Sequence, residues 1–357
     1  MGVRNSTGYQ VIYYDYPQYL AQHRFFGVVP LRLFIRSGVQ SAFNADNSVF
    51  GVENGLNGRF VIPSERLVNI MDYILAGISS GGQYALIAIG YTMVYGILRL
   101  INFAHGDVFM VAGLLVIYAT TAMPLYLSVP FVLVLTAVIG FAIERAAYKP
   151  LRTAPRMSSM ISAIGVSYLL QNLALYITGG LARTYPAIPW FAEAITVFGA
   201  TTKRVTVITP IVTIVLVIAL VALTKYTKVG MGMRAVSKDF ETSQLMGIKI
   251  NSVISATFVI GSFLAAVGSV LYFSNYASVV PTSGALPGLR AFVAAVVGGI
   301  GSIPGAVVGG FIIGICENLV KSTDYAIFSD AFTFLILIVI LCVKPTGIFG
   351  EKNIDKV

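Results

Sequence analysis

The stretch "GILRLINFAHGDVFMVAGLL" (residues 96–115) places three polar side chains, Asn102, His105 and Asp107, among residues that are almost all apolar. Such a set could form a metal site, a general acid–base pair or a structural polar joint. A zinc site needs three or four His, Cys or carboxylate ligands. Here His105 is the only histidine after residue 70, and neither cysteine lies near it in sequence. An acid–base pair needs a defined pocket, which this pattern does not supply. We therefore predict neither a metal site nor a catalytic residue.

We favour a structural role for these polar residues. Ionisable groups in a membrane-spanning region are costly and normally face partners inside the bundle. Asn102 and Asp107 could form hydrogen bonds with His105. Alternatively, Asp107 could cap a helix that begins near Val108, because an N-cap carboxylate accepts hydrogen bonds from backbone N–H groups at the positive helix end. Together with Gly106, these residues predict a helix break between two spans.

The composition indicates a membrane protein with several spans. Of the 357 residues, 57% are hydrophobic and 11% are charged, whereas a soluble domain has about 25% charged residues. Lys and Arg number 24 against 15 acids. In a membrane chain this excess marks cytoplasmic loops and contacts with anionic lipid, so we expect no nucleic-acid partner. The two cysteines, Cys316 and Cys342, lie in apolar runs and offer neither metal-ligand spacing nor a disulfide framework.

Apolar segments that alternate with short loops predict an all-α bundle of about eight or nine membrane spans, including a short broken-helix hairpin. In that hairpin, "GGIGSIPGA" joins two short apolar segments, and its irregular backbone is tolerable only inside protein or beside a cavity. The predicted segments are 72–97, 107–123, 129–147, 158–178, 206–224, 251–273, 286–300, 305–320 and 326–343.

The first 70 residues have a different character. No apolar run there reaches the roughly 20 residues that a span needs, and the order of features is not that of a signal peptide. Two interpretations remain: an amphiphilic N-terminal domain, or a translated upstream region with the true start at Met71. We favour the second, because "MDYILAGISSGG" begins a membrane protein directly. The expected organisation is an extension (1–70), a transmembrane domain (71–350) and a cytoplasmic tail (351–357).

Loop charge predicts the orientation. The loops 144–156 and 225–250 are rich in Lys and Arg, which places both in the cytoplasm. The loop 179–205 must then be external, although its own basic residues fit the rule poorly.

Two further patterns concern packing and the long cytoplasmic loop. Gly301, Gly305 and Gly309 are four residues apart, a spacing that lets helix backbones approach closely in lipid. The stretch "RAVSKDFETSQLMGI" (234–248) predicts one amphipathic helix that ends at Gly247. The pattern alone leaves open a solvated connector or a helix on the membrane surface. The dipeptide Gly-Lys occurs nowhere in the sequence, so the chain has no P-loop for ATP.

Several of these stretches resemble permease subunits of Liv-type ABC importers, which carry branched-chain amino acids. The resemblance begins at "GISSGGQYALIAIGYTMVYGILRLINFAHGDVFMVAG", in which Ile101–Asp107 matches the I-N-x-A-H-G-[DE] block, and continues through 230–272, 288–318 and 344–350. It implies a non-enzymatic half of a pore in a prokaryotic cytoplasmic membrane. It also implies a second homologous permease subunit, two cytoplasmic ATPase subunits that bind the ATP, and an extracytoplasmic substrate-binding protein. No cofactor of its own is expected.

The same resemblance gives the 234–248 segment a role, since it matches the helix that couples such permeases to their ATPases. The residues expected to do this are Arg234, Ala235, Asp239, Leu245 and Gly247.

Two other functions stay open. Permeases of urea or short-amide ABC importers share a similar N-x-A-H-G-[DE] block. A secondary transporter or channel would need no ATPase, but the long cytoplasmic loop and the scarcity of acids within the spans, chiefly Asp107 and Glu317, speak against it. The sequence does not determine which solute is carried.

Overall fold

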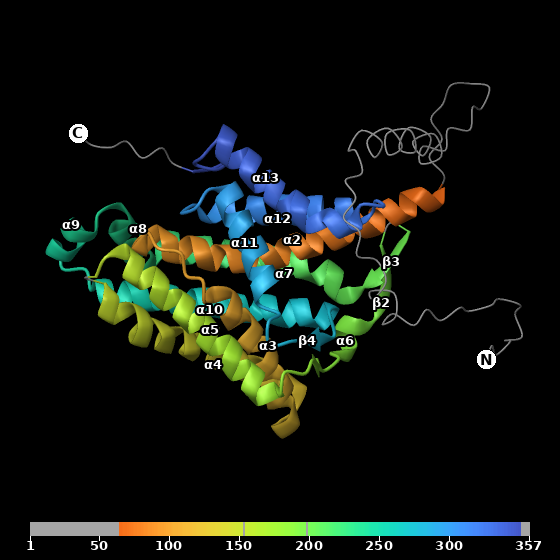
Figure 1. Cartoon of the computed structure of the whole chain (residues 1–357), viewed down its shortest axis with the longest axis horizontal. Helices are drawn as coiled ribbons and strands as arrows, with labels where there is room; N and C mark the ends of the chain where they lie inside the picture. The colour runs from red at the N-terminus through yellow and green to blue at the C-terminus, as the bar shows by residue number, and fades with distance from the viewer. Residues whose placement is uncertain (1–63, 153, 198, 351–357) are drawn as a thin grey trace, which may run out of the picture. The chain divides into compact units, whose positions relative to one another are not determined.

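The computed structural model describes residues 64–350 except residues 153 and 198. The predicted extension and C-terminal tail lie almost entirely outside these residues, and the proposed start at Met71 stays a prediction. Within the described part, eight helices are long and apolar enough to cross a membrane. The expected all-α membrane bundle is therefore confirmed (Figure 1).

The spanning helices follow the predicted apolar segments closely. Seven of them are α2 Ser64–Leu98, α3 His105–Ala122, α4 Leu125–Ile143, α5 Arg156–Thr178, α7 Arg204–Tyr226, α10 Ile250–Asn275 and α12 Ile303–Lys321. The eighth span, Ala326–Val343, consists of the 3-10 turn η3 (Ala326–Phe328) and α13 (Ser329–Val343). The segment predicted at 286–300 forms α11 (Ala285–Gly298), which has 14 residues. At about 1.5 Å per residue α11 is roughly 21 Å long, so it cannot cross a hydrocarbon core of about 30 Å.

The helix α2 forms the centre of the bundle. From Ser79 to Val94 every residue of α2 is buried, because α10, α11, α12 and α7 pack around it. The helices α4, α5, α7 and α13 instead leave most of their side chains partly or fully exposed. In a membrane chain such surfaces face lipid or another membrane subunit.

Glycines allow α2 and α12 to approach each other closely. A Cβ atom on Gly314 of α12 would lie 2.3 Å from the backbone nitrogen of Gly81 on α2, and one on Gly310 would lie 2.7 Å from that of Ala85. These backbones therefore touch with no side chain between them, which is the packing that small residues permit in lipid.

The glycines predicted to pack helices have two different positions. Gly305 and Gly309 lie where α12 meets α11, and a Cβ atom on Gly309 would be 2.1 Å from the carbonyl oxygen of Ala294. Gly301 does not belong with them. It lies in the turn between α11 and α12 with φ +101°, and a Cβ atom there would have no neighbour within 4 Å. Its glycine suits the left-handed backbone of the turn.

Short elements lie at both ends of the bundle (Figure 1). At one end are α8 (Lys228–Lys238) and α9 (Phe240–Leu245). At the other end β2 (Ala194–Val197) and β3 (Ala200–Lys203) form an antiparallel hairpin beside α6 (Pro189–Ala192), while β1 (Arg183–Thr184) pairs antiparallel with β4 (Ser278–Val279). The loops 225–250 and 179–205 thus lie at opposite ends of the bundle, as the predicted orientation requires.

Candidate functional site

The break between α2 and α3 lies deep inside the bundle. The chain leaves α2 at Leu98, passes Arg99 with φ 55°, and starts α3 at His105. His105 lies against Gly90, which is eight residues before the end of α2. The connecting segment therefore runs back along α2, and α3 begins near the middle of the bundle.

His105 fills a slot between two helices. A Cβ atom on Gly90 of α2 would lie 2.1 Å from its Nε2 atom, and one on Gly261 of α10 would lie 3.7 Å from its Cε1 atom. The ring of Tyr91 meets the imidazole edge-on, with ring centroids 5.0 Å apart. His105 is thus a buried packing residue at the break. Among the described residues no three His, Cys, Asp or Glu side chains are grouped closely enough to hold a metal ion.

Asn102 joins the break to α4. Its Oδ1 atom accepts hydrogen bonds from the backbone N–H of Ala104 at 3.1 Å and from the hydroxyl of Tyr148 at 2.7 Å. Tyr148 belongs to the π-helical turn η1 (Glu144–Tyr148) that follows α4. π-helical turns are rare and are often found at functional sites, and this one carries the Tyr148 hydroxyl that bonds to Asn102.

Asp107 is placed differently from the prediction. The helix α3 begins at His105 with Ala104 at the N-cap position, so Asp107 lies in the first turn and does not cap the helix. The N–H groups of Asp107 and Val108 already bond to the carbonyl oxygen of Ala104. The Asp107 carboxylate instead accepts hydrogen bonds from two side chains of α5, the hydroxyl of Ser167 at 2.5 Å and the amide of Gln171 at 3.0 Å.

These α5 partners were not predicted. Ser167 and Gln171 are four residues apart, and this spacing places both on one helix face. Two polar residues on one face of the apolar 158–178 segment were the available signal. The sequence could not show that Asp107, some 60 positions away, would face them.

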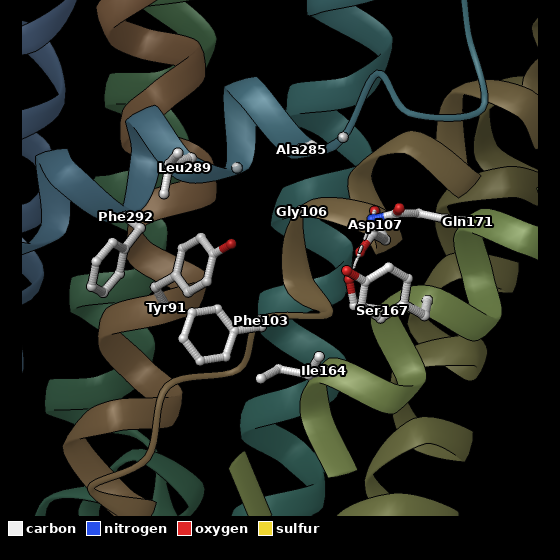
Figure 2. Close-up of a pocket in the computed structure, with 13 residues that line it drawn as sticks. Tyr91, Phe103, Gly106, Asp107, Ile164, Ser167, Gln171, Ala285, Leu289 and Phe292 are labelled. Atoms are coloured by element: carbon white, nitrogen blue, oxygen red, sulfur yellow. Dashed lines mark hydrogen bonds between the residues drawn. The ribbon is translucent and has the colours of Figure 1, made fainter. Parts of the chain in front are cut away.

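A pocket of about 430 Å³ adjoins Asp107. Figure 2 shows Tyr91 and Phe292 on one side of it and Asp107, Ser167 and Gln171 on the other. Its lining is mostly apolar and comes from α2, α3, α5, α11 and the α2–α3 connection. The residues are Tyr91, Phe103, Gly106, Asp107, Ile164, Ser167, Tyr168, Gln171, Gly284, Ala285, Gly288, Leu289 and Phe292.

Three glycines form one wall of this pocket. A Cβ atom on Gly106 would lie 2.7 Å from the carbonyl oxygen of Gly284, and one on Gly288 would lie 2.8 Å from the Cα atom of Gly106. The first turns of α3 and α11 therefore meet backbone against backbone. Any larger residue at these positions would push the two helices apart.

A charged cluster centred on the buried Glu317 joins four helices. Arg290 of α11 pairs with Glu317 of α12 at 3.0 Å and with Asp330 of α13 at 2.5 Å. The hydroxyl of Tyr84 on α2 donates to Glu317 at 2.8 Å and accepts from Arg290 at 3.0 Å, and Lys321 pairs with Glu317 at 2.5 Å. An arginine inside the apolar 286–300 segment was the signal for this cluster. Its partners follow only from the fold.

A second ion pair holds the end of α4 to α10. Glu144 is fully buried, pairs with Arg152, and accepts a hydrogen bond from the hydroxyl of Ser255 on α10 at 2.7 Å. Arg152 also donates to the side chain of Asn251. The four side chains fix the start of the basic 144–156 loop.

The predicted single helix over 234–248 is wrong. The helix α8 ends at Lys238, and α9 begins after Asp239, whose carboxylate accepts a hydrogen bond from the N–H of Thr242 at 3.0 Å. An aspartate side chain that bonds the backbone in this way starts a new helix. Arg234 and Ala235 therefore lie on α8, and Leu245 is the last residue of α9.

Gly247 ends α9 in the manner predicted from the sequence. Its φ is +81°, and the N–H of Ile248 bonds to the carbonyl oxygen of Ser243 at 3.1 Å. This is the Schellman arrangement, in which a left-handed residue, usually glycine, closes the last turn.

The helix α9 exposes apolar side chains at the end of the bundle. Phe240 and Leu245 are 42% and 87% exposed, and Met246, which directly follows the helix, is 78% exposed. In contrast, Met233 and Val236 of α8 are buried, because α8 packs against α7 and α10. The polar loop thus has one helix that is anchored to the bundle and a second that presents apolar groups outward.

Comparisons with known proteins agree with this architecture. Residues 73–342 match the family "Branched-chain amino acid transport system / permease component". The high-affinity branched-chain amino acid transport system permease protein LivH of Salmonella typhimurium is 38% identical over 307 residues, which cover 82% of this chain and 100% of the relative. The permease BraD of Pseudomonas aeruginosa is also 38% identical, over 82% of this chain and 99% of its own length.

A more distant relative is named for the import of a different solute. The ribose import permease protein RbsC of Haemophilus influenzae is 24% identical over 294 residues, which cover 80% of this chain and 88% of RbsC. The family match spans most of the chain, and the likeness to LivH and BraD covers essentially their whole length. The chain is therefore a multi-pass membrane permease subunit that belongs to the branched-chain amino acid transport permease family.

Proposed function

We propose that this chain is one permease subunit of an ATP-driven importer for branched-chain or other hydrophobic amino acids in a prokaryotic cytoplasmic membrane. It forms half of the passage together with a second homologous permease subunit. Two cytoplasmic ATPase subunits bind and hydrolyse the ATP, and an extracytoplasmic binding protein delivers the substrate. The observation that carries the proposal is the likeness to branched-chain amino acid permeases over their full length.

The α8–α9 pair is the proposed contact with the ATPases. Apolar groups exposed on a short helix at the cytoplasmic end are typical of a protein-binding surface. Leu245 and Met246 supply that surface, and α8 transmits a push from it to α7 and α10, against which it packs. Such rigid-body coupling can shift the bundle between outward-open and inward-open states.

Substitution at Gly247 tests the coupling. A Cβ atom at Gly247 would meet no atom of this chain within 4 Å, so a Gly247→Trp variant bears only the backbone strain of a left-handed residue, about 1–2 kcal/mol. A bulky side chain there would nevertheless keep an ATPase from closing over α9. We expect uptake of radiolabelled leucine and substrate-stimulated ATP hydrolysis to be lost, while the amount of complex in the membrane is unchanged.

Gly179 provides the matched control. It follows α5 at the external end, has φ +67°, and a Cβ atom there also has no neighbour within 4 Å. The Gly179→Trp variant should therefore keep ATP-coupled uptake. Normal leucine uptake in Gly247→Trp would refute the coupling role. Uptake of urea in place of leucine by the complete wild-type complex would favour the urea importer, and leucine movement by the lone chain without ATPases would refute the importer itself.

A further inference from the structure

We propose that the pocket between α2, α3, α5 and α11 is a binding site for a free apolar α-amino acid, whose ammonium group binds to Asp107 (Figure 2). This inference rests on the proposed function and adds a substrate site within the permease itself. Its parts are a carboxylate, an apolar wall and a helix N-terminus.

The Asp107 side chain comes first, because it is an ionisable group in an apolar bundle. Asp107 is 3% exposed, and its oxygens accept hydrogen bonds from two neutral side chains, Ser167 and Gln171. No Lys or Arg is among the described residues that line the pocket. A carboxylate offers about four acceptor positions, so it can bind further donors. A cation that enters the pocket would offset the cost of burying this acid.

The apolar wall is suited to a hydrocarbon side chain. Ile164 of α5 and Leu289 and Phe292 of α11 line the pocket together with Phe103. Its volume of about 430 Å³ lies in the range of roughly 300–1,000 Å³ that is usual for small-molecule sites. Neutral urea has neither a cationic group for Asp107 nor hydrocarbon for this wall.

The N-terminus of α11 provides the complement for the substrate carboxylate. Gly284 and Ala285, where this 14-residue helix begins, line the same pocket as Asp107. The positive end of a helix inside a membrane attracts anions, and broken helices in transporters place such ends at substrate carboxylates. An amino acid would thus lie with its ammonium towards α3 and α5 and its carboxylate towards α11.

Photo-crosslinking tests the site directly. The probe is a leucine analogue with a diazirine in its side chain, added to the complete importer in lipid vesicles and activated with light. We expect mass spectrometry to find the label on peptides that contain Ile164 or Leu289. Excess leucine should prevent labelling, whereas 4-methylpentanoate, which lacks the ammonium group, should not.

Variants separate recognition from folding. Asp107→Asn should lower the labelling at least about tenfold, as expected for loss of a charge-assisted hydrogen bond, and Asp107→Glu should retain most of it. Asp330→Asn removes a carboxylate from a span outside the pocket and should leave labelling unchanged. Ile164→Trp fills the pocket from a partly exposed position, keeps every Asp107 hydrogen bond, and should also abolish labelling.

Three results would overturn the proposal. They are an unlabelled pocket in a complex that imports leucine, equal competition by 4-methylpentanoate, and full labelling in both Asp107→Asn and Ile164→Trp. Equal competition by 4-methylpentanoate would indicate a site for fatty acyl chains. None of these results bears on whether the wild-type complex imports leucine, so the proposed function survives each of them. Absence of leucine import by the wild-type complex would instead refute the proposed function.

Discussion

The contact between His105 and Gly90 predicts how much the addition of one methyl group at Gly90 lowers the stability of the protein. Replacing Gly90 by alanine places a methyl group 2.1 Å from Nε2 and 2.4 Å from Cε1 of the imidazole. Ordinary contact between such atoms needs about 3.5 Å, so the ring must move by roughly 1.4 Å. The backbone of α10 at Gly261 also lies near the ring and near the Cα atom of Gly90, which leaves little space for that movement.

The expected loss of stability follows from two opposing effects. Overpacking of a well-packed interior costs about 1–3 kcal/mol, and a shift of this size belongs at the upper limit. Alanine in place of glycine within a helix gains about 1 kcal/mol. The Gly90→Ala variant should therefore be less stable than the wild type by about 2 kcal/mol.

Gly96 supplies the matched control on the same helix. A Cβ atom on Gly96 would meet only the Cα atom of Gly301, at 3.9 Å, so Gly96→Ala keeps the helix gain without the clash. Unfolding of the purified chain in mixed micelles, titrated with sodium dodecyl sulfate, should separate the two variants by about 3 kcal/mol. A double variant, Gly90→Ala with His105→Ala, should be more stable than the sum of the single effects, because the alanine then occupies part of the space that the ring has left. Equal stability of Gly90→Ala and Gly96→Ala would show that the ring does not occupy this slot.

Two further variants test the buried contacts around the break and the charged cluster. Arg290→Met should lower stability by about 3 kcal/mol or more, since it leaves the buried Glu317 without its arginine. Arg204→Met, which removes a partly exposed ion pair, should cost less than about 1 kcal/mol. Equal effects in the same unfolding assay would contradict the burial of the Arg290–Glu317 pair. Tyr148→Phe removes one hydrogen bond to Asn102 and should cost about 1 kcal/mol, and an unchanged unfolding midpoint would show that η1 is not held to the α2–α3 break.

Features that depend on local sequence were predicted well. Runs of apolar residues gave the spans, because a helix must be long and apolar to cross lipid. Gly247 ends α9 as predicted, since a left-handed residue in a helix C-terminus requires little beyond its own backbone. Asp239 shows what the spacing of apolar residues does not predict. The apolar spacing predicted an uninterrupted helix, but a hydrogen bond of its side chain to the backbone divides it into two.

Features that depend on long-range contacts were missed. Asp107 meets Ser167 and Gln171 across 60 and 64 positions of sequence, and Arg290 meets Asp330 across 40. Nothing in the local pattern around either residue selects its partner, because helix positions in the bundle decide which faces meet. The sequence did show that each of these groups is unusual, since an ionisable residue in an apolar segment requires a partner.

The cluster of Arg290, Lys321, Glu317 and Asp330 has an electrical consequence. It contains two basic and two acidic side chains, so its formal charges cancel. An unbalanced charge that crosses the membrane field gains or loses about 2.3 kcal/mol per 100 mV. Helices that move together with this cluster carry no net charge from it, so the membrane voltage does no work on that part of the motion. In the proposed importer, binding events at the surfaces of the bundle would supply the energy for such a motion.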